Sequence, residues 1–343
     1  MRGSPLRVGI VGCGRMGSTI DDEVQDYPAV LLPYAHAAGY AEVSECQVVA
    51  AADINPEALA RFGQRWGVDR LYNDYRQMLA RERLDIVSVT TRATERAEVI
   101  RDAVAAGVRA IFAEKAIACS LREADEIVAL VERSGVVLAV NCSRRWHPYF
   151  MKAEEMVRSG QIGRVLHVYG AGPGAMSHTG SHILDVMRMF AGGDALWVMG
   201  HTDPQKAATD DDIGGNGYIQ FESGVTGFYH ALNSRQVEFD VVGERGRIRT
   251  YNNGINWEFD VFSDRRGMPV RHTFPRPSRV VSPTVGAIRD IVRCLKEGGT
   301  PRCSARDGRA ALEIAIAVRE SERRGGVRVT LPLADRSLSI ISR

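Results

Sequence analysis

Near its amino terminus the chain contains the run Leu6-Arg7-Val8-Gly9-Ile10-Val11-Gly12-Cys13-Gly14-Arg15-Met16-Gly17. An apolar run that leads into the pattern GxGxxG predicts a buried parallel strand, a tight turn and a helix that begins at about Arg15. In that geometry Gly12 allows the turn, Gly14 lets a pyrophosphate approach the backbone, and Gly17 lets the helix pack closely on the strand. Because the first N–H groups of a helix lack partners, anions bind there. The run therefore predicts a dinucleotide-binding site in preference to an ordinary glycine-rich turn.

An acidic residue ends the next apolar run, Gln47-Val48-Val49-Ala50-Ala51-Ala52-Asp53. We expect the Asp53 carboxylate to accept hydrogen bonds from the ribose hydroxyls of the adenosine. Ile54, Asn55 and Pro56 follow, so no Arg or Lys is at hand to neutralise a 2′-phosphate, and the sequence favours NAD over NADP. A second interpretation stays open, in which Asp53 only caps the next helix.

The distance between the glycines and Asp53 exceeds the roughly 20 residues that this pattern normally has. The excess lies between about residues 20 and 45 and includes Asp21, Asp22, Glu23, Tyr34 and His36. We interpret it as an insertion between the first helix and the second strand. Two hypotheses stay open: the insertion overhangs the cofactor or the mouth of the active site, or it is a helical excursion without a functional role.

The composition is that of an ordinary globular protein. The chain has 343 residues, 45% hydrophobic and 25% charged, with a net charge of +2. This length indicates two domains, and the charge gives no strong field for nucleic acid or an anionic membrane. No apolar run approaches the roughly 18 residues of a membrane span, and the first strand begins too early for a signal peptide. The six cysteines form no CxxC pair, which favours reduced thiols and a cytoplasmic location.

Strand and helix patterns alternate over residues 1–143. Predicted helices at about 56–66, 74–81, 95–106 and 120–134 separate predicted strands at 86–91, 108–113 and 136–142. This alternation predicts an α/β domain with a doubly wound parallel sheet. Residues 144–343 form a second predicted domain, in which a helix at about 148–159 precedes seven strand-like runs with short turns, the pattern of an antiparallel meander. Helices at about 285–296 and 306–323 and a strand at 327–331 close the chain.

Glu114 and Lys115 follow the predicted strand at 108–113. Ligands of such sheets bind beyond the carboxyl ends of the strands, so we expect Glu114, Lys115 and Thr91, together with Arg15 and Met16, to contact the cofactor. Lys115 can also donate a hydrogen bond to a substrate hydroxyl or carbonyl and lower the pKa of nearby acids. A surface lysine in a salt bridge is the alternative.

A basic and aromatic segment follows the last predicted parallel strand. It contains Asn141, Arg144, Arg145 and Trp146. Amide, guanidinium and indole groups at a strand end suit recognition of a polar substrate, and we expect these four residues to contribute to substrate binding. The alternative is a domain hinge with structural arginines. The basic groups are too few for a nucleic-acid surface.

Two histidines and an acid occur in Ser177-His178-Thr179-Gly180-Ser181-His182-Ile183-Leu184-Asp185. On a helix, His178, His182 and Asp185 share one face. Oxidation of an alcohol to a ketone needs a proton acceptor, because hydride loss must accompany proton loss, and a histidine suits that role. Two alternatives stay open. Histidines at this spacing bind metals, although no third ligand is apparent, or the residues are polar caps and core.

Together these motifs resemble the Gfo/Idh/MocA oxidoreductase family over nearly the whole chain. The resemblance also rests on Pro148, on Gly160-Gln161-Ile162-Gly163-Arg164-Val165 and on Gly243-Glu244-Arg245-Gly246. It implies a Rossmann domain and then an α/β domain with an open-faced sheet, which members often use to form dimers or tetramers. It further implies oxidation or reduction of sugars and cyclitols with NAD or NADP, with Lys115 and His182 as catalytic residues and Asp185 as a substrate ligand.

The chain departs from the family pattern at three places. Ala116 follows Lys115 where the family has proline, His178 stands where the family commonly has an Asp, and Arg92 and Arg96 replace a proline and a histidine. Three hypotheses follow. The first is an NAD(P)-dependent sugar or cyclitol dehydrogenase in which Lys115, His182 and His178 take part in proton transfer. The second is an enzyme that cleaves glycosides by transient oxidation with no net redox change. The third is a non-catalytic NAD-sensing regulator.

Overall fold

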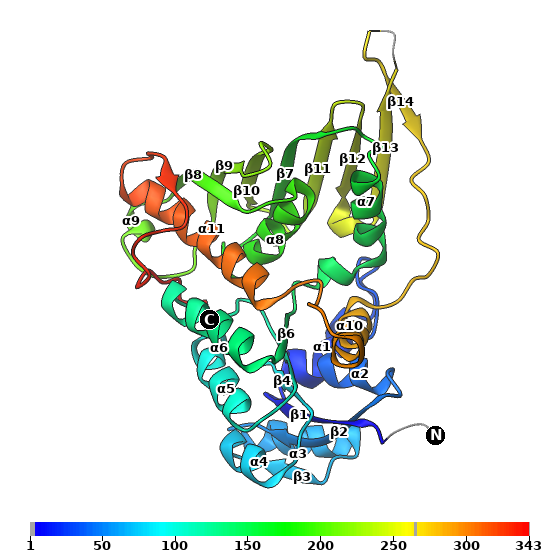
Figure 1. Cartoon of the computed structure of the whole chain (residues 1–343), viewed down its shortest axis with the longest axis vertical. Coiled ribbons are helices and arrows are strands. Elements are labelled where there is room, and N and C mark those ends of the chain that lie inside the picture. The colour runs from blue at the N-terminus through cyan, green and yellow to red at the C-terminus, as the bar shows by residue number, and fades with distance from the viewer. Residues whose placement is uncertain (1–3, 264–265, 343) are drawn as a thin grey trace. The chain divides into compact units, whose positions relative to one another are not determined.

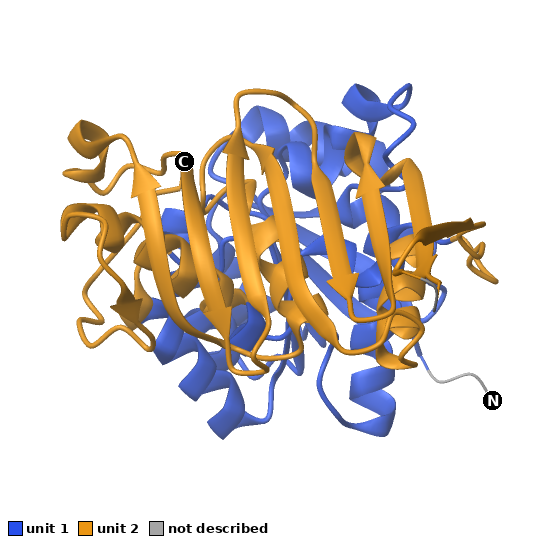
Figure 2. Ribbon diagram, turned by 90° about the horizontal axis from the view of Figure 1, so that it is seen from above, with its two compact units in different colours: residues 1–118, 123–147, 281–307 blue, residues 119–122, 148–280, 308–343 orange. Residues whose placement is uncertain are grey.

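The computed structural model describes residues 4–263 and 266–342, and they separate into two compact units (Figures 1 and 2). Unit 1 comprises the chain through residue 118 with 123–147 and 281–307, and unit 2 comprises 119–122, 148–280 and the chain from residue 308. Neither unit is continuous in sequence, since residues 281–307 return to unit 1 after most of unit 2. The domain boundary expected between residues 143 and 144 stays a prediction.

Among the described residues, unit 1 is built on a six-stranded parallel sheet of order β3-β2-β1-β4-β5-β6. Its strands are β1 (Leu6–Val11), β2 (Cys46–Ala52), β3 (Arg70–Tyr72), β4 (Ile86–Val89), β5 (Ala110–Ala113) and β6 (Val137–Val140). All residues of β4 and β5 are buried, as expected for apolar strands covered on both faces. The predicted doubly wound sheet is confirmed. Its order reverses between β1 and β4, the point where such sheets bind ligands.

Helices join these strands. They are the short π-helix Arg15–Thr19, α1 (Ile20–Val24), α2 (His36–Ala41), α3 (Pro56–Trp66), α4 (Tyr75–Arg81), α5 (Ala93–Ala105), α6 (Leu121–Ser134), the 3-10 turn Ser143–Trp146 and α10 (Pro283–Glu297). The Asn55 side chain accepts the N–H groups of Glu57 and Ala58 at 3.0 and 3.3 Å, the role of an N-cap residue. Asn55 and not Asp53 therefore caps α3, and the interpretation of Asp53 as a mere cap is wrong.

The described part of unit 2 contains a nine-stranded sheet of order β14-β13-β12-β11-β7-β10-β9-β8-β15. Its strands are β7 (Val165–Pro173), β8 (Ala195–Thr202), β9 (Gly215–Phe221), β10 (Thr226–Leu232), β11 (Glu238–Gly243), β12 (Gly246–Tyr251), β13 (Asn256–Phe262), β14 (Pro269–His272) and β15 (Val329–Thr330). The prediction of a largely antiparallel sheet is confirmed. The prediction of a simple antiparallel meander was wrong, because β10 pairs with β7 in parallel, while every other described strand pair of this sheet is antiparallel.

Glycines on the strands of unit 2 let helices approach one face of the sheet. The helices are α7 (Pro148–Arg158), α8 (Gly180–Ala191), α9 (Pro204–Ala207) and α11 (Ala305–Arg323), with a 3-10 turn at Asn252–Gly254. A Cβ at Gly172 of β7 would lie 2.4 Å from Ile183 of α8, and one at Gly200 of β8 would lie 2.4 Å from the backbone of Val318 in α11. Larger residues would push the helices away, so the sheet sequence sets where α8 lies.

The other face of this sheet carries large apolar side chains. Met199 and Phe228 are each 43% exposed, and Tyr218 packs its ring 5.3 Å from those of Trp197 and Phe228. We call Trp197, Met199, Tyr218 and Phe228 the open face. Among the described residues, no helix is long and apolar enough to cross a membrane.

Candidate active site

The glycine loop of unit 1 has the geometry that a dinucleotide requires. Gly12 has φ +98°, which favours glycine, and a Cβ at Gly17 would lie 2.1 Å from the Gly12 carbonyl oxygen. A Cβ at Gly14 would meet nothing within 4 Å, so the backbone there is open to an approaching phosphate. The Thr90 hydroxyl, beyond β4, donates to the Gly12 carbonyl at 2.5 Å and ties the loop to the next strand.

The Asp53 carboxylate lies at the same loop. Its Oδ2 accepts the backbone N–H of Cys13 at 2.6 Å, and its Oδ1 accepts that of Asn55 at 2.8 Å. The next residue, Ile54, is 91% exposed and offers no positive charge to a 2′-phosphate. The loop, the open space at Gly14 and this carboxylate fit NAD.

Arg15, Met16 and Thr91 are the other residues expected to contact the cofactor. Arg15 is exposed and pairs with Glu23 of the insertion at 2.7 Å, and Met16 is half-buried. The Thr91 carbonyl accepts from the guanidinium of Arg96, which also donates to the carbonyl of Ala116. Arg96 thus ties the segment after β4 to the segment after β5, a structural role at a position where the chain departs from the family pattern. Cofactor contact by Arg15, Met16 and Thr91 stays a prediction.

A buried polar network surrounds Glu114. Its Oε1 accepts from the side-chain amide of Asn141 at 2.7 Å and from Nε2 of His36 at 3.1 Å. The His36 ring is fully buried, stacks on Phe112 at 4.2 Å and places Nδ1 2.5 Å from the Ser88 hydroxyl. Because an ionised carboxylate only accepts, Nε2 carries the hydrogen of this bond.

The network acts on Lys115 through Glu114. Burial alone would raise the pKa of Glu114, but the hydrogen bond and attraction of His36, with Lys115 and Asn141, lower it to about 2. The carboxylate therefore stays ionised at neutral pH, and its Oε2 accepts the backbone N–H of Lys115 at 3.3 Å. The peptide bond between Lys115 and Ala116 is cis. The hydrogen bond from the Lys115 N–H to Glu114 holds Lys115 two residues beyond the end of β5, at the carboxyl edge of the sheet.

The insertion contributes to this edge. The Asp21 carboxylate accepts the N–H groups of Tyr34 and Ala35 at 2.9 and 2.7 Å. The hydroxyls of Ser282 and Thr284, at the start of α10, donate to the carbonyls of Pro33 and Tyr34 at 2.6 and 2.9 Å. So fixed, the segment brings His36 to Glu114. The sequence placed His36 in the insertion but gave no sign of this contact, because its partners lie 52 to 105 residues away.

The expected substrate residues of unit 1 differ in their surroundings. Asn141 is buried, and its Oδ1 has no hydrogen-bond partner among the described residues. Arg144 is half-buried. Trp146 is buried and donates to Asp290 of α10 at 3.0 Å, and Arg145 lies 3.4 Å from Asp307. Substrate contact by these four residues stays a prediction.

In unit 2 the structure corrects one expectation. Helix α8 begins at Gly180, so His178 lies in the preceding turn, and the expectation that it shares a helix face with His182 and Asp185 is wrong. In this turn the Asp212 carboxylate accepts the N–H groups of Ser177 and His178, each at 2.8 Å. His182 and Asp185 do lie on α8 and are buried, whereas His178 is exposed with Nδ1 3.3 Å from the Thr179 hydroxyl.

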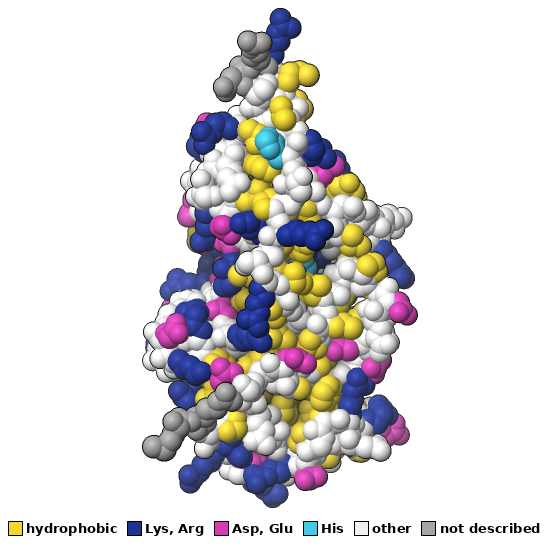
Figure 3. Space-filling view, turned by 90° about the vertical axis from the view of Figure 1, so that its right-hand side faces the viewer, with side chains coloured by type: hydrophobic (Ala, Val, Ile, Leu, Met, Phe, Trp, Pro, Cys, Tyr) yellow, Lys and Arg dark blue, Asp and Glu magenta, His cyan; other side chains and the backbone are white. Residues whose placement is uncertain are grey.

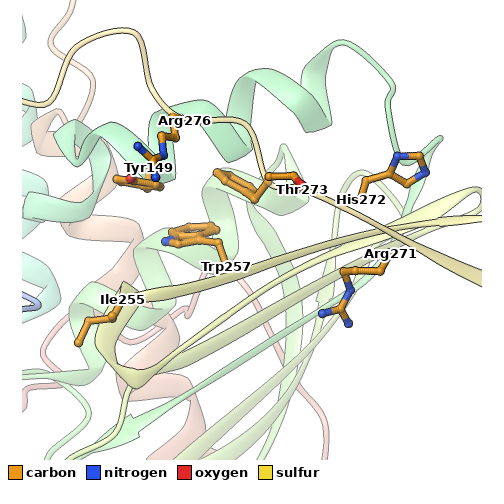
Figure 4. A pocket seen from close by; sticks show the side chains of 8 residues that line it. Tyr149, Ile255, Trp257, Arg271, His272, Thr273 and Arg276 are labelled. Atoms are coloured by element: carbon orange, nitrogen blue, oxygen red, sulfur yellow. The ribbon is translucent and has the colours of Figure 1, made fainter.

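Unit 2 also contains a pocket of about 360 Å³ (Figure 4). It is lined by Tyr149, Ile255, Trp257, Arg271, His272, Thr273, Phe274 and Arg276. The rings of Trp257 and Phe274 pack 4.8 Å apart, and Arg271 pairs with Glu258 at 3.1 Å. In the upper part of Figure 3, hydrophobic side chains lie beside a histidine and between Lys and Arg side chains. No residue expected from the sequence at the reaction site lines this pocket.

Both units match models of one protein family. Residues 6–142 match the oxidoreductase family with an NAD-binding Rossmann fold, and residues 169–331 match the C-terminal alpha/beta domain of the same family. Unit 1 thus carries the NAD-binding domain that the glycine loop and Asp53 predict.

Curated proteins and solved structures resemble the chain over most of its length. D-apiose dehydrogenase of Paraburkholderia graminis is 28% identical over 84% of each chain, and myo-inositol 2-dehydrogenase of Thermotoga maritima is 23% identical over 92% of this chain and 96% of its own. A levoglucosan dehydrogenase in complex with NADH and L-sorbose shares the fold with a TM-score of 0.80 and 20% identity, over 96% of this chain and 100% of its own. With both family models matched in order along its length, the chain belongs to the Gfo/Idh/MocA family of NAD-binding oxidoreductases.

Proposed function

We propose that this protein is an NAD-dependent dehydrogenase that oxidises a secondary hydroxyl of a sugar or cyclitol, or reduces the corresponding ketone. The observation that carries the proposal is the buried His36–Glu114–Asn141 network, which holds Lys115 beyond β5, two strands from the glycine loop. The names of the relatives support the substrate class, since they act on D-apiose and myo-inositol.

In the proposed reaction the chain supplies proton transfer and orientation. NAD held by the glycine loop and Asp53 would supply the hydride acceptor for oxidation of the carbinol carbon and the hydride donor for reduction of the ketone. Lys115 holds the reacting oxygen as a cationic hydrogen-bond donor, and His182 takes the hydroxyl proton as the carbonyl forms. His178 relays that proton or contacts the substrate. Asp185, Arg144, Arg145, Trp146 and Asn141 bind the remaining substrate hydroxyls.

The test is turnover of D-apiose, myo-inositol and levoglucosan with NAD⁺, followed by NADH absorbance. We expect Lys115→Ala and His182→Ala to lower the rate at least 100-fold, the usual contribution of a positioned acid or base. Lys206→Ala and His201→Ala, at exposed positions, serve as matched controls. Rates within about tenfold of wild type, roughly 1.4 kcal/mol, would remove both residues from the mechanism. Product formed without stoichiometric NADH would instead indicate glycoside cleavage.

We also propose that the protein forms a homodimer or homotetramer through the open face. Met199 and Phe228 leave apolar area on this face, and contiguous apolar patches on soluble proteins commonly mark interfaces. The six buried thiols support a cytoplasmic location.

A further inference from the structure

One carboxylate holds the turn that carries His178 and leads into α8. Asp212 lies between α9 and β9, and its two oxygens accept the N–H groups of Ser177 and His178, each at 2.8 Å. Hydrogen bonds to an ionised acceptor are the stronger kind. Because both oxygens are used on consecutive N–H groups, the carboxylate fixes the direction of the backbone at His178.

Two further elements face this carboxylate. Tyr229 of β10 and Arg319 of α11 both lie within its electrostatic reach. The Tyr229 hydroxyl is buried without a hydrogen-bond partner among the described residues, and a Cβ at Gly180 would lie 2.6 Å from it. The start of α8 is therefore confined between the Asp212 carboxylate and the Tyr229 ring.

We propose that Asp212 is a positioning residue for the two histidines, a role that rests on the proposed function of His182. By holding the N–H of His178 and the turn before Gly180, it sets where the His178 and His182 side chains project. A base works best when a third group orients it.

Asp203 offers a matched control on the same unit. Its Oδ1 accepts the N–H groups of Gln205 and Lys206 at 3.0 and 3.3 Å at the start of α9, so Asp203→Ala also removes a carboxylate from two backbone donors. In the protein without substrate, we expect Asp212→Ala to accelerate amide hydrogen exchange of residues 177–178 about tenfold or more, the result of losing their acceptor. Asp203→Ala leaves this exchange unchanged.

Activity is measured with whichever of D-apiose, myo-inositol and levoglucosan turns over fastest. We expect Asp212→Ala to lower kcat about 10–100-fold, the usual cost of losing a partner that orients a histidine, with KM within about threefold. Asp212→Asn keeps one acceptor oxygen, so its kcat should fall between those of wild type and Asp212→Ala. This variant also tests the inference if Asp212→Ala fails to fold. The Kd of both Asp212 variants for NADH, measured by fluorescence, should stay within about twofold of the wild-type value, because the residues expected at the cofactor belong to unit 1.

The outcomes separate this inference from the proposed function. Retained activity in His182→Ala would overturn the proposed function and with it the role given to Asp212. If His182→Ala is inactive but the Asp212 variants have the same amide exchange and the same kcat as Asp203→Ala, the inference alone is overturned. Faster exchange with an unchanged kcat would also overturn it, because Asp212 would then be only structural.

Discussion

At the scale of single residues, the buried Glu114 carboxylate contributes to the stability of unit 1 in a pH-dependent way. Its pKa of about 2 lies below the roughly 4.3 of an exposed glutamate. A depressed folded-state pKa adds stability above the unfolded value, and that stability is lost as the pH falls from about 4 toward 2. A shift of this size corresponds to about 3 kcal/mol.

We therefore expect wild type and Glu114→Gln to converge in acid. The difference in their free energies of unfolding should shrink by about 2 kcal/mol between pH 7 and pH 3, measured by urea unfolding. Glu57→Gln, at an exposed position of α3, is the control and should show a nearly constant difference. A constant difference for Glu114→Gln would contradict the assignment of an ionised, stabilised Glu114.

The partner of this carboxylate gives a second prediction. His36→Ala removes a hydrogen bond from a buried charge and should destabilise the protein by about 3–5 kcal/mol. His201→Ala removes a histidine from Glu322 at 2.8 Å, but that side chain is 73% exposed, so the cost should stay below about 1 kcal/mol. Equal changes in the urea midpoint for His36→Ala and His201→Ala would mean that the His36–Glu114–Asn141 network adds little to the free energy of unfolding.

Residues of the cofactor loop were predictable because their requirements are local. Gly12, Gly14 and Gly17 follow directly from one strand and turn, and Asp53 follows the next strand. His36 was not predictable as a partner of Glu114, because that contact depends on how the insertion is fixed by α10. Asp212 was missed for the same reason, since it caps a turn 34 residues earlier in the chain.

At the scale of elements, close packing of α8 on β7 should be sensitive to one added carbon. Gly172→Ala brings a Cβ within 2.4 Å of Cδ1 of Ile183, and we expect a loss of about 1–3 kcal/mol. Ile183→Val removes that Cδ1, so the double variant should lose less than the sum of the single variants. Gly193→Ala, where the nearest atoms would lie 3.4 Å away, is the control in the same thermal unfolding series. Additive losses would rule out the clash.

Elements with strong apolar patterns were predicted well. The helices at 56–66 and 306–323 match α3 and α11 within one residue. The short strand β3 and the edge strand β14 were missed. All four residues of β14 are exposed, so no buried alternation marks it. The helix face expected to carry His178 with His182 and Asp185 was wrong at His178, because the spacing of these residues does not show that α8 begins only at Gly180.

At the scale of the whole molecule, the open face predicts the oligomeric state. Phe228→Arg places a charge on this face, and we expect it to convert the oligomer to a monomer by light scattering after gel filtration. Met268→Arg, at a 63% exposed position outside the open face, should leave the mass unchanged. A wild-type monomer at tens of micromolar would contradict the proposal.

The return of residues 281–307 to unit 1 has a consequence for biosynthesis. Ser282 and Thr284 hold the insertion, and the Cys303 carbonyl accepts the N–H of Val140 at 3.0 Å in β6. A nascent chain that has emerged only through residue 147 lacks these partners, although its parallel strands are already complete. We expect the NAD-binding unit to reach its final form on the ribosome only after residue 307 has left the exit tunnel, long after its last parallel strand has been made.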